Sequence, residues 1–512
     1  MKRLLLAVLA TALLVPHTAW AAWTEAKSRH FVIYSEQSPE RLRAFAEELE
    51  RFDQTVRRLR GMEDPPLTDA GRLTIYVLPD QRAIEDLARQ QHVAGFYIGR
   101  AAGAVAFVHR GAEGGLRGEL TARTVLFHEY VHHLMLSELD VALPAWLVEG
   151  AAEFFATARI EKDGSVQVGI PPQHRAYGLL NLSGLSTEQM LGAANIRYSS
   201  AQRELLYGRG WLLTHYLTFE PTRQDQLSAY VNAMASGKSA LESARAAFGD
   251  LKQLDRELRN YLDQRRLKGV LVSAKALTVG PIELRPLTPA ESAMMPVRIR
   301  SDRGVNARTA PRVADMARRA AAAFPNDPAA QAVLAEAEFD ARNYAAALAA
   351  AERALAAKPD HPHALIYKGR ALMEIGRADP AKADWPAIRA VLGRANRLDP
   401  DDAEPLMLFY QTFLAQGAKP TANALEGLVY AQRLAPQDDG LRLLTVRALL
   451  AADKLAAARR TFGPIVNDPH KGRWSDQWTV VEEAMEKGDA QSALALLEAQ
   501  DKQYRASREG GA

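Results

Sequence analysis

The sequence predicts two regions of different fold class, an α+β domain followed by an all-α solenoid of helical repeats. Short β-type runs alternate with amphipathic helical stretches from Trp23 to about Ala102. Beyond about Leu271 a proline-rich segment breaks this pattern, and the chain after it is rich in alanine and repeats itself. A chain of 512 residues is also long enough for two or more domains.

The first residues have the features of a secretory signal peptide. Lys2 and Arg3 are positive, Leu4 to Val15 is apolar, and Ala19-Trp20-Ala21 is a small-x-small cleavage site. The apolar run is short for a membrane span, which favours a cleaved signal over the alternative of an uncleaved anchor. We therefore expect residues 1–21 to be removed, leaving a periplasmic or secreted protein with no stable membrane anchor.

Charge and cysteine content exclude several classes of function. The formal net charge is +3, and loss of Lys2 and Arg3 leaves 3 − 2 = +1 because no acid precedes Ala22. A nearly neutral protein offers no electrostatic argument for nucleic acid, so we expect none as a partner. The absence of cysteine excludes disulfides, thiolate chemistry and a lipoprotein anchor.

The α+β domain is expected to span residues 22–275. Strands are predicted at His30–Tyr34 and Arg72–Leu78, and an amphipathic helix from Pro39 to Leu59. Another strand is predicted at Gly103–His109, where small residues suit close approach by a second backbone. A peptide substrate could add to this strand, or the strand could be an ordinary sheet edge.

The segment His128-Glu129-Tyr130-Val131-His132 carries the clearest chemistry. It lies in a predicted helix, because Thr121 to Leu139 contains no proline or glycine and has apolar residues at helical spacing. Residues four apart share a helix face, so His128 and His132 can both hold one metal ion, with Glu129 to the side.

A second helix, begun near Pro144, carries Glu149 and Glu153. A catalytic zinc ion needs a third protein ligand and an open position, and Glu149 is the best candidate for that ligand. Glu153 follows one turn later and can accept a hydrogen bond from the far nitrogen of a ligand histidine. The expected cofactor is therefore Zn²⁺.

These segments resemble the gluzincin metallopeptidases, especially the bacterial peptidase-MA-like domains. That family combines His-Glu-x-x-His with Trp-Leu-x-Glu-Gly-x-Ala-Glu, which Trp146 to Glu153 match. The resemblance covers about Trp23 to Leu267 and implies a zincin-like fold. It also implies that zinc is bound by three ligands, that one glutamate acts as general base and acid, and that another supports a ligand. The three ligands would be His128, His132 and Glu149. Glu129 would be the general base and acid, and Glu153 would support a ligand.

Other acidic residues could also be the third zinc ligand. Metzincins place the third ligand six residues after the second histidine, where this chain has Glu138. That arrangement needs a glycine where Met135 stands, and on a continuing helix Glu138 points away from His132. Asp140 is the other rival. His133 is one residue off the ligand face and is expected at the surface or in support of a ligand.

The implied reaction is metal-assisted hydrolysis of a peptide bond, in which Glu129 takes a proton from water and passes it to the leaving amine. Tyr207 is the candidate oxyanion donor, because Tyr207 to Leu217 resembles the downstream helix of these domains. Tyr207, Trp211 and His215 also form an i, i+4, i+8 stripe, so core packing is an equal alternative for Tyr207. His215 is expected in the core or beside a ligand.

Turn-forming segments rich in proline and aspartate recur along the C-terminal region. Pro325-Asn326-Asp327-Pro328 recurs as Pro359-Asp360-His361-Pro362, a shift of 359 − 325 = 34 residues, and related turns follow at Pro400, Pro436 and Asp468-Pro469. A period near 34 with paired helices resembles tetratricopeptide repeats. We assign residues 303–505 to these repeats and residues 276–302 to a linker or small strand patch. A longer step before Pro400 implies an insertion around Gly376 to Ile388.

The sequence thus predicts an exported zinc metallopeptidase whose repeats recruit protein substrates or a protein partner. Two alternatives remain: a catalytically inactive peptidase-like scaffold that only binds proteins, and a zinc hydrolase of a non-peptide amide. If the repeats only recruit, deletion of the chain beyond Pro281 should leave cleavage of a short peptide intact.

Overall fold

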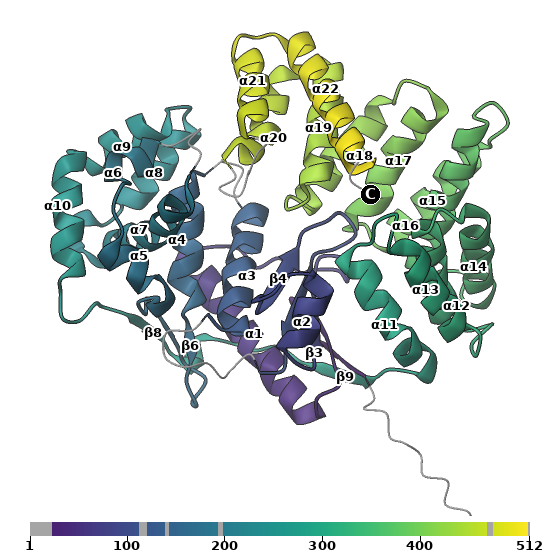
Figure 1. The fold of residues 1–512 in the computed structure, drawn as a ribbon, viewed down its shortest axis with the longest axis horizontal. Helices are drawn as coiled ribbons and strands as arrows, with labels where there is room; N and C mark the ends of the chain where they lie inside the picture. Colours follow the sequence, from purple (N-terminus) through teal and green to yellow (C-terminus); the bar gives the residue numbers. More distant parts are fainter. Residues whose placement is uncertain (1–22, 112–119, 139–142, 193–197, 468–474, 510–512) are drawn as a thin grey trace, which may run out of the picture.

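The computed structural model describes residues 23–111, 120–138, 143–192, 198–467 and 475–509. The expected signal peptide, residues 1–21, lies outside these ranges. Figure 1 shows a mixed sheet between two groups of helices: residues 145–262 on one side, and residues 289–509 on the other side and above. Within the described ranges, no helix is both long and apolar enough to cross a membrane.

The main sheet, as far as the structure describes it, has six strands in the order β4-β5-β3-β2-β1-β9. Strands β2, β3 and β5 run parallel, whereas β4, β1 and β9 are antiparallel to their neighbours, so the sheet is mixed. The strands are β1 (Thr24–Lys27), β2 (Phe31–Ser35), β3 (Leu73–Leu78), β4 (Gly95–Ile98), β5 (Val105–His109) and β9 (Glu283–Pro286).

Different helices cover the two faces of this sheet, because side chains alternate between faces along each strand. Ile33, Ile75 and Ala106 face α1 and α3 in the main core. On the opposite face Tyr76 stacks between Tyr34 and Phe107, with ring centres 5.5 and 5.4 Å away, and packs with α2 and α11. The covering helices are α1 (Pro39–Arg60), α3 (Ala122–Glu138), α2 (Gln81–Ala88) and α11 (Pro289–Arg303).

The remaining helices of the N-terminal region form a layer beside α3, and a second sheet, β6-β7-β8, lies next to them. The segment Tyr207 to Leu217, whose sequence resembles a downstream helix, lies within α7. The helices are α4 (Ala145–Ala156), η1 (Gln173–Arg175), α5 (Ala176–Asn181), α6 (Thr187–Gly192), α7 (Ser200–Phe219), η2 (Pro221–Arg223), α8 (Gln226–Ala235), α9 (Ala240–Phe248), α10 (Leu251–Leu262) and η3 (Ala274–Ala276), and the strands are β6 (Arg159–Ile160), β7 (Val166–Val168) and β8 (Val270–Val272).

The predicted strand Gly103–His109 forms as β5, but it is not an edge strand. It lies between β4 and β3, so its backbone is paired on both sides and no peptide can add to it. The short strand β4 ends the described sheet on this side instead. The edge was misplaced because Gly95–Ile98 is only four residues long and carries a weak sequence signal.

The segment expected as a linker or a small strand patch, residues 276–302, contains a short strand, as the second alternative expects, and is part of both regions. Strand β9 extends the main sheet beyond β1, and α11 follows it directly. Met295 and Ile299 of α11 pack on the sheet, whereas Met294 and Val297 pack on the helical repeats. Pro289, read as a breaker, occupies the first turn of α11, where proline is well tolerated.

The all-helical region is built from successive helix pairs that pack on their neighbours. The recurring acidic turns mark where new helices begin: Asp327, Asp402 and Asp438 each cap a helix by accepting a backbone N–H bond. The turn at Asp468-Pro469 lies outside the described residues. The helices are α12 (Ala310–Ala321), α13 (Pro328–Asp340), α14 (Tyr344–Ala357), α15 (Pro362–Ala378), α16 (Trp385–Leu398), α17 (Ala403–Gln416), α18 (Ala422–Leu434), α19 (Asp439–Ala451), α20 (Leu455–Asn467), α21 (Ser475–Glu486) and α22 (Ala490–Glu509).

The repeats also hold the connection between β4 and β5. Ala101 is buried among α17, α18 and α19, and its N–H donates to Asp438 Oδ2 over 2.7 Å. Arg100 Nη2 donates to Asp302 Oδ1 of α11 over 2.8 Å, and Asp302 also accepts from Tyr76 of the sheet. The two regions therefore share an extensive, specific interface.

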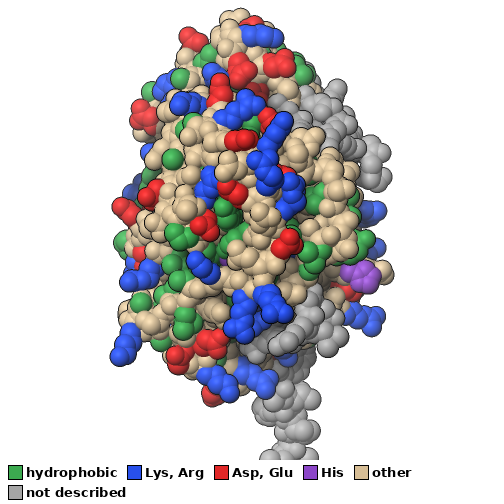
Figure 2. Space-filling model, turned by 90° about the vertical axis from the view of Figure 1, so that its left-hand side faces the viewer, with side chains coloured by type: hydrophobic (Ala, Val, Ile, Leu, Met, Phe, Trp, Pro, Cys, Tyr) green, Lys and Arg blue, Asp and Glu red, His purple; other side chains and the backbone are tan. Residues whose placement is uncertain are grey.

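The outer face formed by the helices on the left of Figure 1 carries mixed charge. Figure 2 shows basic and acidic side chains interspersed over this face, with hydrophobic side chains scattered between them. Arg245 of α9, for example, pairs with Glu188 of α6 at 2.7 Å.

Candidate metal centre

The candidate centre lies where α3 meets α4 and α7. Helices α4 and α7 cross very closely: a Cβ atom at Gly150 would lie 2.3 Å from the carbonyl oxygen of Gly210. Glycine at both positions lets the backbones touch, which brings Glu149 of α4 and Tyr207 of α7 to the same side of α3. The sequence does not need a long loop to assemble the site, because α4 follows α3 after a short connection.

The structure brings His128, His132 and Glu149 together. The Nε2 atoms of the two histidines are 3.0 Å apart, and Glu149 Oε2 lies 3.3 Å from that of His128 and 3.6 Å from that of His132. Around a tetrahedral ion with bonds of about 2.0–2.1 Å, ligand atoms are roughly 3.3 Å apart. Three donor atoms of the types that zinc prefers are thus spaced as ligands of one ion.

Burial adds to the requirement for a cation at this place. The side chain of Glu149 is fully buried, and both histidine side chains are only 13% exposed. A buried carboxylate is costly unless a positive charge or a metal ion compensates it. His132 Nδ1 is buried and has no hydrogen-bond partner among the described residues, so the polar contacts given for this ring are those of Nε2 with His128 and Glu149.

Glu153 lies on the far side of His128, near the nitrogen for which the sequence expects it to be a hydrogen-bond acceptor. Its Oε1 atom is 3.6 Å from His128 Nδ1, and the side chain is buried. Burial raises the pKa of the Glu153 carboxyl, but a hydrogen bond from His174 and the charge of Arg175 outweigh it and lower the pKa to about 2. Glu153 is therefore a fixed anion, suited to orienting an imidazole.

Tyr207 contacts the same histidine from α7. Its ring centre lies 6.0 Å from that of His128, with 22° between the ring planes, and the guanidinium carbon of Arg175 is 4.5 Å from the Tyr207 ring centre. Burial raises the pKa of Tyr207, and the charges of Glu149 and Glu129 raise it further. Tyr207 thus remains a neutral hydrogen-bond donor, and it borders the site rather than packing only in the core.

Glu129 is half-buried, and its charge acts on two tyrosines. Its charge contributes to the raised pKa of Tyr207 and to that of Tyr97, on β4, whose main cause is burial. The Tyr97 hydroxyl is 3.0 Å from Nδ1 of His133. His133 takes no part in the metal cluster; burial lowers its pKa to about 4, so it stays neutral.

His215 is a core residue. Its Nε2 atom lies 2.9 Å from the carbonyl oxygen of Lys268 and 3.1 Å from that of Gly169, and Nδ1 lies 3.0 Å from the Tyr261 hydroxyl. The ring therefore donates from Nε2 to the backbone and accepts from Tyr261 at Nδ1. Its role is to tie α7 to α10 and to the segments around β7 and β8, away from the metal cluster.

The rival third ligands cannot be placed in the same way. Helix α3 continues to Glu138, as the sequence predicted. The side chain of Glu138 and the whole of Asp140 lie outside the described part of the structure.

A second cluster of possible ligand atoms lies behind α3 and consists of His30, Glu50 and Asp53. These side chains are already satisfied by protein groups: His30 Nδ1 lies 2.8 Å from Glu50, and Asp53 accepts from Arg57 and Tyr130 at 2.8 and 2.7 Å. Because Arg57 supplies the positive charge, this cluster is a structural ion network linking α1 to α3 and has no need of a metal ion.

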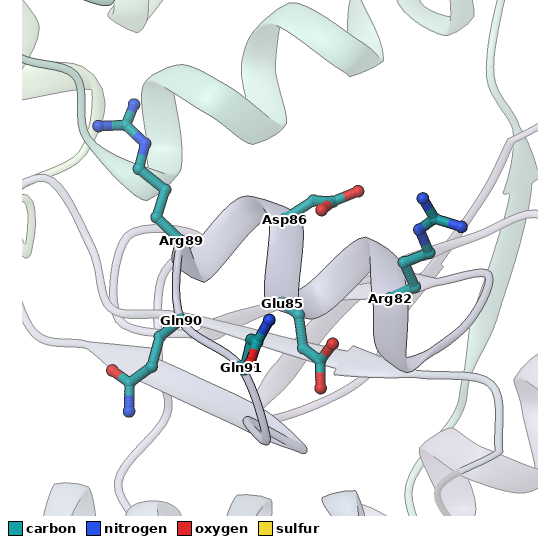
Figure 3. A pocket seen from close by; sticks show the side chains of 6 residues that line it. All are labelled: Arg82, Glu85, Asp86, Arg89, Gln90 and Gln91. Carbon is teal, nitrogen blue, oxygen red and sulfur yellow. The ribbon is translucent and has the colours of Figure 1, made fainter.

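A hollow of about 530 Å³ lies against α2 (Figure 3). It is lined by charged and amide side chains of that helix and of the turn after it, including Arg82, Glu85 and Arg89. Helix α2 covers the sheet face opposite to α3, so this hollow is separate from the metal cluster.

Sequence reasoning missed His174, Arg175 and Tyr97. His174 Nε2 is 3.0 Å from Glu153 Oε2, and Arg175 donates to Oε1 of the same carboxylate. Neither residue stands in a recognisable motif, and both reach the site through the short helix η1, twenty-odd residues after Glu153. We find no pattern in the sequence that would have indicated them.

Comparisons with known proteins match the C-terminal region. Residues 338–383 match the tetratricopeptide repeat family, and this match does not reach residues 128–153. Among solved structures, the chain is similar to a thermophilic tetratricopeptide repeat protein from Thermus thermophilus, with 17% identity. That similarity covers 33% of this chain and 89% of the other, and its TM-score of 0.29 is too low to argue from. No curated protein matches the chain.

The coarser sequence prediction is confirmed. An N-terminal α/β region with a mixed sheet is followed by an all-helical, tetratricopeptide-like region. Repeats of this kind suggest protein–protein interaction.

Proposed function

We propose that the chain is an exported zinc-dependent metallopeptidase of the gluzincin, peptidase-MA-like type, with repeats that recruit a protein substrate or partner. One observation carries this proposal: two imidazole Nε2 atoms and one buried carboxylate oxygen lie 3.0, 3.3 and 3.6 Å from one another. That donor set fits a catalytic zinc site, which has three protein ligands and an open position.

His128, His132 and Glu149 would hold the ion. Bound there, zinc would supply Lewis acidity, which polarises a scissile carbonyl and makes water a better nucleophile at neutral pH. Glu129, next to His128 on the same helix, takes a proton from the attacking water and passes it to the leaving amine. Tyr207, a neutral phenol beside His128, donates a hydrogen bond to the oxygen that gains negative charge.

The short edge strand β4 supports a peptide as substrate. Its outer edge is not paired with another strand of the described sheet, and an extended peptide can add to such an edge through main-chain hydrogen bonds. The Tyr97 hydroxyl on this strand is 3.0 Å from His133 Nδ1 of α3, so a peptide along β4 would run next to the helix that carries the proposed base. This feature favours a peptide over another amide as the substrate.

The proposal is tested with purified mature protein by measuring bound zinc and the hydrolysis of unfolded casein. Wild type should bind about one zinc ion per chain and cleave casein. Glu129→Gln should keep the zinc and lose at least roughly 100-fold in rate, as expected for loss of a general base. Glu161→Gln, a change at an exposed glutamate of the same region, is the control and should match wild type.

Two results would reject the proposal. A wild type that binds no zinc in zinc-containing buffer would leave the inactive, protein-binding scaffold as the better account. Casein cleavage that survives Glu129→Gln would exclude this centre as the source of the activity.

A further inference from the structure

The short helix η1 closes over the candidate centre through two consecutive side chains. Arg175 donates from Nε and Nη2 to Glu153 Oε1, over 2.9 and 2.7 Å, and His174 Nε2 lies 3.0 Å from Oε2. Both oxygens of the buried Glu153 carboxylate are thus occupied by one segment of chain. The same carboxylate also lies 3.6 Å from His128 Nδ1.

Arg175 reaches beyond Glu153. Its remaining nitrogen, Nη1, donates to Glu204 Oε2 over 2.8 Å, one turn before Tyr207 on α7. Its guanidinium lies against the Tyr207 ring, with 4.5 Å between the guanidinium carbon and the ring centre. One planar side chain, 20% exposed, therefore connects α4 with α7.

Each of these contacts leads to His128. Glu153 lies 3.6 Å from the Nδ1 atom of His128, and the Tyr207 ring faces the His128 ring at 6.0 Å. The three side chains come from η1, α4 and α7, and each of them borders the histidine or its direct neighbour. A group that fixes Glu153 and Tyr207 together would fix both the orientation of His128 and the place of the phenol.

We propose that Arg175 is a positioning residue that sets Glu153 and Tyr207 relative to His128. The inference rests on the proposed function, since it concerns support of the metal ligand and of the oxyanion donor. Arginine suits the role because its planar fork bonds a carboxylate and stacks on an aromatic ring at the same time. A lysine could keep the charge but would make neither the fork nor the stack.

The test measures zinc affinity, by competition with a chromogenic chelator, together with kcat and KM for a short fluorogenic peptide. Arg175→Lys and Arg175→Met should raise the zinc dissociation constant by roughly 10- to 100-fold, as for other residues that hold a metal ligand from behind. Both should also lower kcat by at least about 10-fold with little change in KM, because Tyr207 is displaced. Lysine should restore only a small part of the loss.

Arg209→Lys is the matched control. Arg209 lies on α7, the helix that carries Tyr207, and is 21% exposed, much like Arg175. It pairs with Asp255 at 2.6 Å and is not one of the residues of the metal cluster. Its variant should keep zinc affinity and kcat within about twofold of wild type. If Arg175→Met does not fold, Arg175→Lys carries the test, because it keeps the charge beside Glu153.

The outcomes separate this inference from the proposed function. A wild type without zinc overturns both. A wild type that binds zinc and cleaves peptide, with Arg175 variants of unchanged zinc affinity and kcat, overturns the inference alone. A lower melting temperature in the Arg175 variants with wild-type zinc affinity and kcat also overturns it, since Arg175 would then serve only to fasten η1.

Discussion

At the scale of single residues, the centre depends on a buried carboxylate that comes from another helix than the two histidines. Glu149 is fully buried and lies within 3.3 and 3.6 Å of the two histidine nitrogens. Its negative charge, rather than its shape, is what a zinc ion would use. A substitution that removes the charge of Glu149 but keeps its shape therefore distinguishes a metal ligand from a residue that only packs.

We predict that Glu149→Gln lowers the zinc content of purified protein from about one ion to nearly none, because an amide oxygen is a much weaker ligand than a carboxylate. Glu138→Gln should keep full zinc, since α3 is helical up to this position and residues six apart on a helix do not share a face. Elemental analysis after dialysis against a weak chelator measures both. The reverse pattern would make Glu138 the third ligand.

A second residue-scale prediction concerns His215. Burial lowers its pKa to about 4, although its hydrogen bonds to Lys268 and Gly169 raise it, whereas an unfolded histidine has a pKa of about 6.5. The unfolded chain therefore takes up a proton first, and the free energy of unfolding falls as pH drops from 6.5 towards 4. The stabilisation from a neutral His215 is complete above pH 6.5, and its loss is at most about 1.4 kcal/mol per pH unit.

His215→Gln tests this, because glutamine keeps a donor and an acceptor but does not titrate. Urea unfolding followed by tryptophan fluorescence should show wild type more stable at pH 7.5, with the difference narrowing between pH 6.5 and 4. His92→Asn, at an exposed histidine, is the control. A difference that stays constant with pH would show that His215 titrates normally in the folded protein.

Sequence patterns predicted part of the centre well. Helical spacing placed His128 and His132 on one face, and this depends only on local geometry that any α-helix imposes. Arg175 and Tyr97 were not predicted, because they approach from a three-residue helix and a four-residue strand whose positions depend on tertiary packing. A buried Glu153 requires a cationic partner, but the sequence does not say which of many arginines supplies it.

At the scale of elements, the contact between α4 and α7 decides whether the site forms. Gly150 and Gly210 face each other, and a Cβ atom at Gly210 would lie 2.6 Å from the carbonyl oxygen of Trp146. This contact sets the distance between the helix that carries Glu149 and the helix that carries Tyr207. A wider separation of the two helix axes would therefore move Glu149 away from Tyr207.

We predict that Gly150→Ala destabilises the N-terminal region by at least about 1–3 kcal/mol, the usual cost of overpacking, and weakens zinc binding by moving Glu149. Gly393→Ala on α16 is the control, because in the part of the chain that the structure describes the one atom near a Cβ there is the flexible end of Arg397, at 3.5 Å. Alanine there should be neutral or stabilising by up to about 1 kcal/mol. Thermal melts and chelator competition measure both effects; equal results for the two variants would contradict a tight α4–α7 contact.

The same scale explains why the helix α11 was not predicted. Prolines after residue 279 indicate breaks in helix or strand, but proline at the first turn of a helix favours the helix. Thr288 accepts a bond from the backbone of Glu291 and Glu291 bonds back, so α11 begins with a complete capping box. That capping pattern was present in the sequence beside Pro289 and outweighs the composition.

At the scale of the whole molecule, the repeats are built into the N-terminal region. Strand β9 pairs with β1, α11 covers one face of the sheet, and Asp438 and Asp302 hold the β4–β5 connection. Strand β4 is the edge at which we propose that substrate binds. The repeats thus pack directly on the connection that follows β4. This fits a role in recruiting a protein close to the proposed site.

Deletion beyond Pro281 is expected to leave cleavage of a short peptide intact if the repeats only recruit, and this arrangement argues against that condition. Such a fragment lacks β9 and α11, so Trp23, Tyr34, Tyr76 and Phe107 lose the helix that covers them. We predict that residues 22–281 form no stable domain, whereas residues 22–304, which keep β9 and α11, melt cooperatively but below the full-length chain. Circular dichroism melts and limited proteolysis compare the two fragments. If residues 22–281 melted like the full chain and cleaved the short peptide equally well, the repeats would be a separate recruiting arm, and the contacts of Asp302 and Asp438 would be incidental to the site.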